Sequence, residues 1–329
     1  MDSTASHAAP APYRSPPWLL GGHAQTIYPY LLARPPMDYR RERVTTSDGD
    51  FWDFDWLAAP SAPAAPVVVL FHGLEGGADS LYARTLMAEL AARGWAGVVT
   101  HFRGCTGTPN LLPRAYHSGD HEEVDGMLRA VRERVGADRT LYAIGVSLGG
   151  SALLNWLGRM GPAASSLVTS AAAVSVPLDL TAAGIAIGKG LNRIYTAHFL
   201  QTLKPKALSM AQRFPGMLDS DRIRRVRTMW DFDDVVTSPL HGFRGADDYW
   251  ARASSKPWLA QVAVPTLVLN ARNDPFVPAS SLPAQGEVSR HVLLEQPAAG
   301  GHAGFMTGPA PGRNDWLPQR LLAFVARGT

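Results

Sequence analysis

The chain has 329 residues, the length of one large α/β domain that carries an insertion. Its 31 basic and 28 acidic residues nearly cancel, which gives no reason to expect a nucleic-acid partner. The single cysteine, Cys105, excludes an intramolecular disulfide. The N-terminus lacks the basic and apolar regions of a signal peptide, and no apolar run approaches the roughly 18–20 residues of a membrane span. We expect a soluble, cytoplasmic protein, and a peripheral membrane contact stays open.

Short apolar runs alternate with helical patterns over most of the chain. Residues 1–16, rich in Ala, Pro and Ser, predict a flexible tail before a catalytic domain at 17–329. Two predicted strands flank a Ser-Asp-Gly turn within 39–58. Continuous apolar runs predict further buried strands, and apolar positions at helical spacing predict helices between them. These strands lie in 65–73, 95–104, 140–146, 166–177, 264–271 and 291–296, and the helices in 80–94, 120–136, 149–160 and 314–327.

This alternation is typical of a parallel sheet with helices on both faces. It stops at about residue 178, and residues 178–256 are helical and irregular before the sheet pattern resumes. We therefore predict an α/β fold with a mostly parallel sheet flanked by helices. The segment at about 178–256 is predicted to be an inserted helical cap over the sheet.

The stretch G-V-S-L-G at 145–149 places Ser147 between a predicted strand and a predicted helix. A G-x-S-x-G elbow needs small residues, because larger side chains would collide with the neighbouring strand and helix. Such a turn presents the serine hydroxyl outside the sheet, at the N-terminus of a helix. An ordinary glycine-rich turn is the alternative, but the strand–turn–helix setting favours a nucleophile.

A serine hydroxyl needs a base in order to attack. In this arrangement the chain order is serine, then acid, then histidine. Asp274 follows the next-to-last predicted strand, and His302 lies in a glycine-rich loop after the last one. His302 is predicted to take the Ser147 proton, and Asp274 to orient His302 and stabilise its charged form. The alternatives are that Asp274 caps a helix starting near Val277 and that His302 is a plain loop histidine; less favoured partners are Asn273, Asp233, Asp234, Asp247 and Asp248.

Acyl transfer also needs donors for the oxyanion. We expect one to be the backbone N–H of Leu148, directly after the serine. The other is assigned to the N–H of Leu74, in F-H-G-L-E-G-G at 71–77. His72 precedes the serine in the chain and is expected to brace this loop rather than act as the base. A leucine after His-Gly, in place of the HGGG of many lipases, favours a different hydrolase subgroup.

Other reactive residues have plainer explanations. His117 and His121 have a spacing that metal ligands use, but Gly119 and a helix start separate them, so no metal is predicted. No base is paired by pattern with Cys105, which is expected to be structural. Four arginines within 221–230 suit either a solvated face paired with acids or a contact with anionic groups. No glycine-rich nucleotide motif follows a strand, so no cofactor is expected.

Taken together, the motifs resemble the YheT-like α/β-hydrolases, which are related to the lipid-acting ABHD group. The resemblance implies a Ser-Asp-His hydrolase on an α/β-hydrolase fold with a cap, with Ser147, Asp274 and His302 at the triad positions. One departure is Asn273, where the family usually has a second acid. The family's assigned activities are carboxylesterase or lipase-like. The similarity runs from about residue 17 to the end and rests on GGHAQTIYP, FHGLEGG, HFRGCTG, YHSGDHEEVD, GVSLGG, DDVVTSPLHGF, LNARNDPF and GGHAGF.

The sequence therefore predicts a cofactor-independent hydrolase of carboxylic esters, with short- to medium-chain or lipid-like acyl groups, that works through an acyl-enzyme. Apolar cap residues favour an apolar acyl chain, but a place in the cap core is favoured over the pocket lining for each of them: Phe199, Met229, Trp230 and Phe243. An acyltransferase or thioesterase would use the same triad. A binding protein with silent chemistry is a third interpretation, against which the intact serine, acid and histidine argue. The segment GGHAQTIYP has no role that the sequence reveals, and its His23 is expected to be structural.

Overall fold

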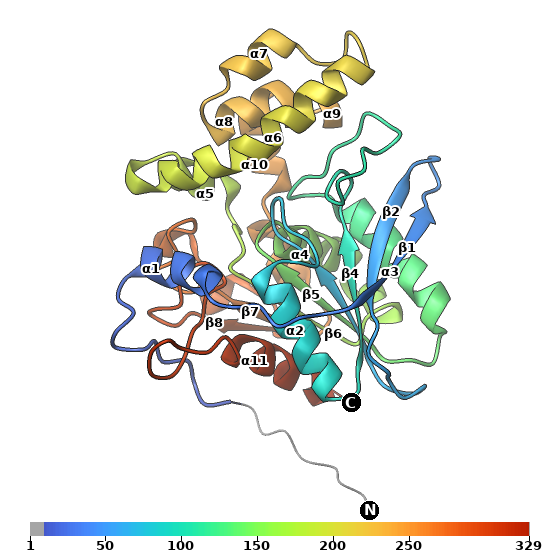
Figure 1. The fold of residues 1–329 in the computed structure, drawn as a ribbon, viewed down its shortest axis with the longest axis vertical. Coiled ribbons are helices and arrows are strands. Elements are labelled where there is room, and N and C mark those ends of the chain that lie inside the picture. The colour runs from blue at the N-terminus through green and yellow to red at the C-terminus, as the bar shows by residue number, and fades with distance from the viewer. Residues whose placement is uncertain (1–9, 329) are drawn as a thin grey trace, which may run out of the picture.

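The computed structural model describes residues 10–328, and within them eight strands form one sheet (Figure 1). The strand order is β1-β2-β4-β3-β5-β6-β7-β8. β1 pairs antiparallel with β2, and β2 pairs antiparallel with β4. The remaining pairs, from β4 across to β8, are parallel. The strands are β1 (Tyr39–Thr45), β2 (Phe51–Leu57), β3 (Val67–Phe71), β4 (Ala96–His101), β5 (Leu141–Val146), β6 (Ser170–Val174), β7 (Thr266–Leu269) and β8 (Val292–Glu295).

Helices connect the strands and form the cap. The α-helices are α1 (Gly22–Ile27), α2 (Leu81–Ala92), α3 (His121–Val135), α4 (Leu148–Met160), α5 (Leu180–Ile187), α6 (Arg193–Arg213), α7 (Ser220–Arg225), α8 (Met229–Phe232), α9 (Ser238–His241), α10 (Ala246–Ala253) and α11 (Trp316–Val325). Short 3-10 turns are η1 (Tyr28–Leu31), η2 (Gly161–Ser166), η3 (Gly190–Asn192), η5 (Lys256–Gln261), η6 (Ala279–Ser281), η7 (Gln285–Glu287) and η8 (Ala326–Gly328), and η4 (Asp233–Thr237) is a π-helical turn.

The central strand β3 shows why this sequence makes a sheet that is covered on both faces. All five of its side chains are buried, and side chains along a strand alternate between the two faces. Val67 and Val69 belong to an apolar cluster with residues of α3 and α4. Val68 and Leu70 belong to the opposite cluster, with residues of α2 and α11. Burying each side chain contributes about 1.5–3 kcal/mol, so a continuous apolar run is stable only between two helical layers.

The cap lies between β6 and β7 in the chain and comprises α5 to α10. Figure 1 shows its helices as a layer beyond one end of the sheet. It has an apolar cluster of its own, which includes Leu203, Ile223 and Val236. The predicted fold class, a mostly parallel sheet flanked by helices with an inserted cap, is therefore confirmed. Among the helices that the structure describes, none is long and apolar enough to cross a bilayer.

The N-terminal segment that the sequence predicts as a tail lies partly outside the described residues, since residues 1–9 are not described. From Ala11 on, the segment contacts the domain. The Tyr13 hydroxyl donates to the Met306 carbonyl oxygen at 2.9 Å, and the Tyr13 ring packs edge-on against Phe305 and Trp316. The composition of residues 10–16 did not indicate these contacts.

Candidate active site

Ser147 lies in the turn between β5 and α4, in a backbone conformation that few residues adopt. Its φ of 54° and ψ of −121° lie outside the regions open to most side chains. The turn packs closely against β3: a Cβ on Gly149 would lie 2.4 Å from the Phe71 carbonyl oxygen, so only glycine fits. The Ser147 N–H donates to the Val174 carbonyl oxygen at 2.8 Å and ties the turn to β6. This strained strand-to-helix turn has the geometry of a nucleophile elbow.

His302 and Asp274 form a hydrogen-bonded pair. His302 Nδ1 lies 2.8 Å from Asp274 Oδ2, and the Asp274 side chain is buried. The other carboxylate oxygen of Asp274 accepts the N–H of Phe276 at 2.8 Å. The helix-capping alternative for Asp274 is wrong, because the next helical turn of the described chain is η6, whose N-cap is Pro278.

The structure brings the three predicted residues to one place. Ser147 and His302 line the same cavity, and Asp274 contacts His302 from the side of Nδ1. With Nδ1–H donated to the carboxylate, Nε2 is the nitrogen with a free lone pair, as a general base requires. The residues come from the ends of β5, β7 and β8, which agrees with the rule that sites in parallel sheets form at the carboxyl ends of strands.

Four consecutive backbone N–H groups hold the loop that carries His302. Each of them donates to a side chain from a distant part of the chain, and together these side chains come from α1, the turn after β7 and the end of β6. The pairs are Gly300–Gln25, Gly301–Asn273, His302–Thr26 and Ala303–Ser175, at 2.8, 3.1, 2.9 and 2.9 Å. Loop amides that would otherwise be free to reorient are therefore each fixed by one acceptor.

Gln25 is buried and uses both ends of its amide. Its Oε1 accepts from Gly300 N–H at 2.8 Å and from Asn273 Nδ2 at 2.9 Å. Its Nε2 donates to the Leu19 carbonyl oxygen at 2.8 Å and to Ser15 Oγ at 3.0 Å. Gln25 therefore joins the turn that carries Asp274 to the loop that carries His302. The neutral Asn273 suits this contact, since it supplies a donor to Gln25 and an acceptor to Gly301.

The segment GGHAQTIYP is thus part of the site, a role that the sequence did not reveal. A Cβ on Gly22 would lie 1.9 Å from the Asn273 carbonyl oxygen, so the backbone of α1 packs directly on that turn. A short helix without periodic apolar residues gives no pattern for a site. The sequence shows only a pair of polar residues, Gln25 and Thr26, in a helix with no charged side chain, and their burial becomes visible only in the structure.

A row of aromatic rings links α1 and the cap to His302. His23 Nδ1 lies 3.1 Å from the Tyr195 hydroxyl, and the two rings stack with centroids 5.8 Å apart. Tyr195, in α6, packs edge-on against Phe276 at 4.6 Å. The Phe276 ring lies 4.2 Å from the His302 ring. His23 therefore has a structural contact with the cap, and Phe276 is a neighbour of His302 that sequence reasoning missed.

The two backbone amides expected to bind an oxyanion lie in the loops around Ser147. Across residues 10–328, neither the Leu74 N–H nor the Leu148 N–H donates to a protein acceptor. The next amide in the first loop, that of Glu75, is already bonded to the Tyr116 hydroxyl at 2.7 Å. Leu148 is the first residue of α4, where the helix dipole adds positive potential.

His72 braces the loop that carries Leu74. Its Nδ1 donates to the Gly73 carbonyl oxygen at 2.8 Å, and its Nε2 accepts the N–H of Phe102 at 3.2 Å. These two bonds require the neutral ring. Burial, together with the nearby His101, lowers the pKa of His72 to about 3, so the ring stays neutral. Its structural role agrees with the expectation from chain order.

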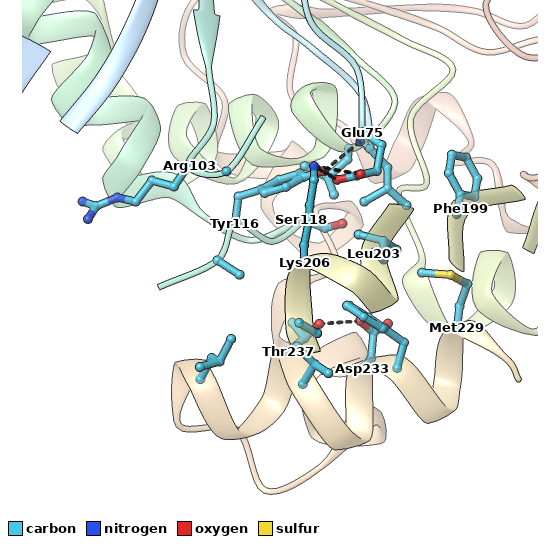
Figure 2. Close-up of a pocket in the computed structure, with 18 of the residues that line it drawn as sticks. Glu75, Arg103, Tyr116, Ser118, Phe199, Leu203, Lys206, Met229, Asp233 and Thr237 are labelled. Atoms are coloured by element: carbon cyan, nitrogen blue, oxygen red, sulfur yellow. Dashed lines mark hydrogen bonds and ion pairs between the residues drawn. The ribbon is translucent and has the colours of Figure 1, made fainter. Parts of the chain in front are cut away.

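An ion pair joins the cap to the same loop. Lys206 Nζ, from α6, lies 2.8 Å from the Glu75 carboxylate, and the Tyr116 hydroxyl donates to Glu75 Oε1 at 3.1 Å. Figure 2 shows Lys206 reaching from the cap helix to Glu75 beside Tyr116. Glu75 itself has a φ of 56°, which is uncommon for a residue with a side chain.

Ser147 and His302 open into a cavity of about 460 Å³ between the sheet and the cap. Most of its wall is apolar, as expected of a site for an apolar ligand. Of the four apolar cap residues that the sequence favoured as cap core, Phe199 and Met229 line the cavity, whereas Trp230 and Phe243 do not. Trp230 is 41% exposed and donates to Asp247, and Phe243 packs against Tyr249 in a separate cluster. The apolar lining includes Leu74, Leu180, Ile187, Leu203, Phe232 and Val236.

One carboxyl group stands in this wall. Asp233, in the π-helical turn η4, accepts from the Thr237 hydroxyl and the Trp250 indole N–H, both at 2.7 Å. Figure 2 shows the bond to Thr237 on the cap side of the cavity. Burial raises the pKa of Asp233 to about 6 in spite of these two donors. Asp233 belongs to the cap and does not pair with His302, whose acid partner is Asp274.

The other reactive candidates have structural contacts. Burial raises the pKa of the Cys105 thiol to about 12, so it is not a thiolate near neutral pH. His117 precedes α3 and packs against His241 of the cap, with ring centroids 4.5 Å apart. His121 Nδ1 donates to the Gly119 carbonyl oxygen at 3.0 Å. Over the described part of the chain, no three or more His, Cys, Asp or Glu side chains are grouped as metal ligands would be.

Two of the four arginines within 221–230 form ion pairs with acids. Arg222 lies 3.0 Å from Asp234, and Arg224 lies 2.6 Å from Asp221. The run is therefore a solvated face with acidic partners, the first of the two interpretations that the sequence offered.

Comparisons with known proteins agree with this architecture. The sequence model of the α/β hydrolase fold family matches residues 66–309. The chain is 37% identical to "Putative esterase YheT" of Escherichia coli over 303 residues, which cover 91% of this chain and 88% of the relative. It is 29% identical to the human "Phospholipase ABHD3" over 94% of this chain and 77% of that protein. The solved structure of the Pyrococcus furiosus esterase Pf2001 superposes with a TM-score of 0.56 at 14% identity, covering 90% and 98% of the two chains, which is a likeness of fold.

The family match spans well over half of the chain, and the Escherichia coli relative is similar across most of both sequences. The strand order, the serine turn after β5 and the inserted cap are the features expected of that fold. The protein is a YheT-like member of the α/β-hydrolase fold family.

Proposed function

We propose that this protein hydrolyses carboxylic esters by nucleophilic catalysis, with Ser147 as nucleophile, His302 as general base and acid, and Asp274 as the residue that orients His302. The observation that carries the proposal is the strained Ser147 turn opening into the same cavity as a histidine whose Nδ1 is held by a buried carboxylate. The names of the relatives, an esterase and a phospholipase, support ester cleavage.

The chemistry follows from these positions. Ser147 Oγ bonds to the acyl carbon while its proton passes to His302 Nε2. The carbonyl oxygen becomes an oxyanion, which the N–H groups of Leu74 and Leu148 stabilise. When the tetrahedral species collapses, the alcohol leaves with the proton from His302. Water then attacks the acyl-enzyme, again giving a proton to His302, and the acid departs as Ser147 regains its proton.

The shape of the cavity favours an apolar acyl group. Its volume is about 460 Å³ and its wall is mostly aliphatic and aromatic. Buried apolar contact stabilises each acyl methylene by about 0.8 kcal/mol relative to water. An ester with a medium-length acyl chain therefore gains binding energy in the cavity that acetate esters lack.

The test is hydrolysis of p-nitrophenyl esters from acetate to laurate, with wild type beside Ser147→Ala. Loss of the nucleophile should lower kcat by several orders of magnitude. The matched control is Ser166→Ala, an exposed serine in η2 whose hydroxyl donates to the Ala163 carbonyl oxygen. Activity that survives in Ser147→Ala would refute the assignment.

The same assay separates the related chemistries. Added ethanol intercepts the acyl-enzyme of a transferase and yields an ethyl ester, whereas a hydrolase yields acid. An acyl thioester in place of the oxygen ester reports thioesterase preference. A fluorophosphonate probe that labels wild type but not Ser147→Ala supports the nucleophile independently of substrate choice. A probe that labels neither protein would favour a binding function on this scaffold.

A further inference from the structure

The first part of the cap has a charge pattern that the proposed chemistry does not use. Residues 180–218 contain no acidic side chain. The same stretch carries five cations: Lys189, Arg193, Lys204, Lys206 and Arg213. This segment is therefore cationic in a protein whose total charge is nearly balanced, and it forms a wall of the cavity that contains Ser147.

Three of these cations have partners within the protein. Lys206 pairs with Glu75, Lys204 donates to the carbonyl oxygens of Arg224 and Val226, and Arg213 donates to that of Asn110. The other two are exposed and, over residues 10–328, take part in no ion pair; they are Lys189 and Arg193. Of these five cations, the two that have no partner within the described residues therefore both lie at the junction of α5, η3 and α6.

The same junction exposes large apolar side chains. Ile185, Leu191 and Ile194 are 46, 69 and 66% exposed. α5 has no charged residue and is apolar on two sides, because Ala183 and Ile187 line the cavity while Ile185 faces outward. A helix at the surface of a water-soluble domain normally carries polar residues on its outer side. The outer surface of α5 is therefore separated from the cavity by the thickness of a single helix.

The segment around α1 extends this apolar surface. Leu20 and Ile27 are 77 and 47% exposed. α1 lies beside the junction, since Asn192 donates to the Pro275 carbonyl oxygen at 2.6 Å and Gly22 also packs against Pro275. Figure 1 shows α1 and α5 at the same side of the molecule.

We propose that this docking face, formed by Ile185, Lys189, Leu191, Arg193 and Ile194 with Leu20 and Ile27 beside it, binds the surface of a lipid bilayer that contains anionic phospholipids. Exposed apolar side chains enter the interface, and the two unpaired cations approach the anionic headgroups. A protein partner would have to supply both an apolar patch and acidic groups in register, whereas any anionic bilayer supplies both. Membrane binding by this face is a separate property from the proposed ester hydrolysis. It rests on the proposed function only in one respect: an apolar ester that leaves the bilayer here would enter the cavity that contains Ser147.

The experiment is co-sedimentation of the full-length protein with vesicles of phosphatidylcholine alone or with 30% phosphatidylglycerol. The apolar variant combines three substitutions in the docking face: Ile185→Gln, Leu191→Gln and Ile194→Gln. Its control combines Leu111→Gln and Met217→Gln, which replace two side chains outside the face that are 58 and 46% exposed. The charge variant is Lys189→Gln, Arg193→Gln; its control is Arg224→Gln, Arg225→Gln in α7. Turnover of soluble p-nitrophenyl butyrate is measured for every protein.

We expect wild type to bind the anionic vesicles and to be released by salt. The charge variant should bind about fivefold more weakly for each cation removed, and the apolar variant at least about tenfold more weakly. Both controls should bind like wild type, and all variants should turn over the soluble ester like wild type. Wild type that turns over the soluble ester but binds neither vesicle overturns the docking face and leaves the proposed function intact. Equal binding by variants and controls also overturns it. Wild type that binds as expected but hydrolyses no ester supports the face and refutes the proposed function.

Discussion

Replacing Gln25 with leucine removes the contact that joins the Asp274 turn to the His302 loop, with little change in side-chain volume. The change leaves the Gly300 N–H and the Leu19 carbonyl oxygen without the partners they have at 2.8 Å. Both groups are in buried residues, and each buried group without a partner costs about 1–3 kcal/mol. The free energy of unfolding should fall by about 2–6 kcal/mol, a large part of the roughly 5–15 kcal/mol of a typical domain.

Activity should fall for a separate reason. With Gly300 released, the loop that carries His302 loses one of its four fixed amides, and a shift of about 1 Å at the base costs on the order of 100-fold in rate. We expect kcat for p-nitrophenyl butyrate to drop by about that factor, with KM within about twofold, because Gln25 does not line the cavity. Urea unfolding and steady-state kinetics, both at about 15 °C, near the temperature at which domains are typically most stable, measure the two effects separately.

Two further variants sharpen this test. Gln212→Leu, an exposed glutamine in α6, should change neither quantity. Thr26→Val keeps the shape of the side chain but removes the acceptor for the His302 N–H, and it should lower kcat with a smaller loss of stability. If Gln25→Leu unfolds at the wild-type urea concentration and keeps the wild-type kcat, then the hydrogen bonds to the four N–H groups of residues 300–303 do not position His302.

Three more predictions concern the acid, the cavity and the cap. Asp274→Asn cannot hold the same His302 tautomer and should lower kcat by about 10⁴-fold, measured with the butyrate ester; a loss below tenfold would contradict the assignment. Leu203→Trp narrows the cavity and should lower kcat/KM for laurate esters by at least about tenfold while butyrate changes little, and an unchanged chain-length profile would show that Leu203 is not part of the acyl site. Asp233→Asn tests the raised pKa of about 6. Because the buried carboxyl favours its protonated form, the free energy of unfolding of wild type relative to the variant should be greatest below pH 4. It should fall by about 3 kcal/mol as the pH rises to above 6. Urea unfolding of both proteins between pH 4 and 8 measures this difference, and a difference that does not change with pH would mean that the carboxyl is not perturbed.

The sequence predicts the sheet and the serine turn well because both depend on local patterns. A continuous apolar run such as Val67–Phe71 can be stable only as a strand between two layers, and the alternation with helices then determines a parallel sheet. The turn at Ser147 is recognisable because its glycines are next to it in the chain. The positions of Asp274 and His302 follow from chain order.

The rest of the site depends on contacts between distant residues, which no local pattern encodes. Gln25 matters because it meets Gly300, and nothing near Gln25 in the sequence indicates that partner. In the cap, Met229 lines the cavity and its neighbour Trp230 does not. α8 has only four residues, too few to show a helical period, so the sequence could not separate the two orientations.

The contact between α1 and the His302 loop also sets an order of events during protein synthesis. Gln25 and Gly300 are 275 residues apart, so a ribosome that adds about 5–20 residues per second makes the glutamine about 14–55 s before its partner. Until then, Gln25 lacks the contact with Gly300 that fixes the loop of His302. The sheet up to β6 and the serine turn can form earlier, but the residues proposed for catalysis, Ser147, Asp274 and His302, come together last. A nascent chain is therefore unable to cleave esters until its final segment has emerged, and a protease that removes residues 10–27 from the finished protein would inactivate it while leaving Ser147 and the sheet in place.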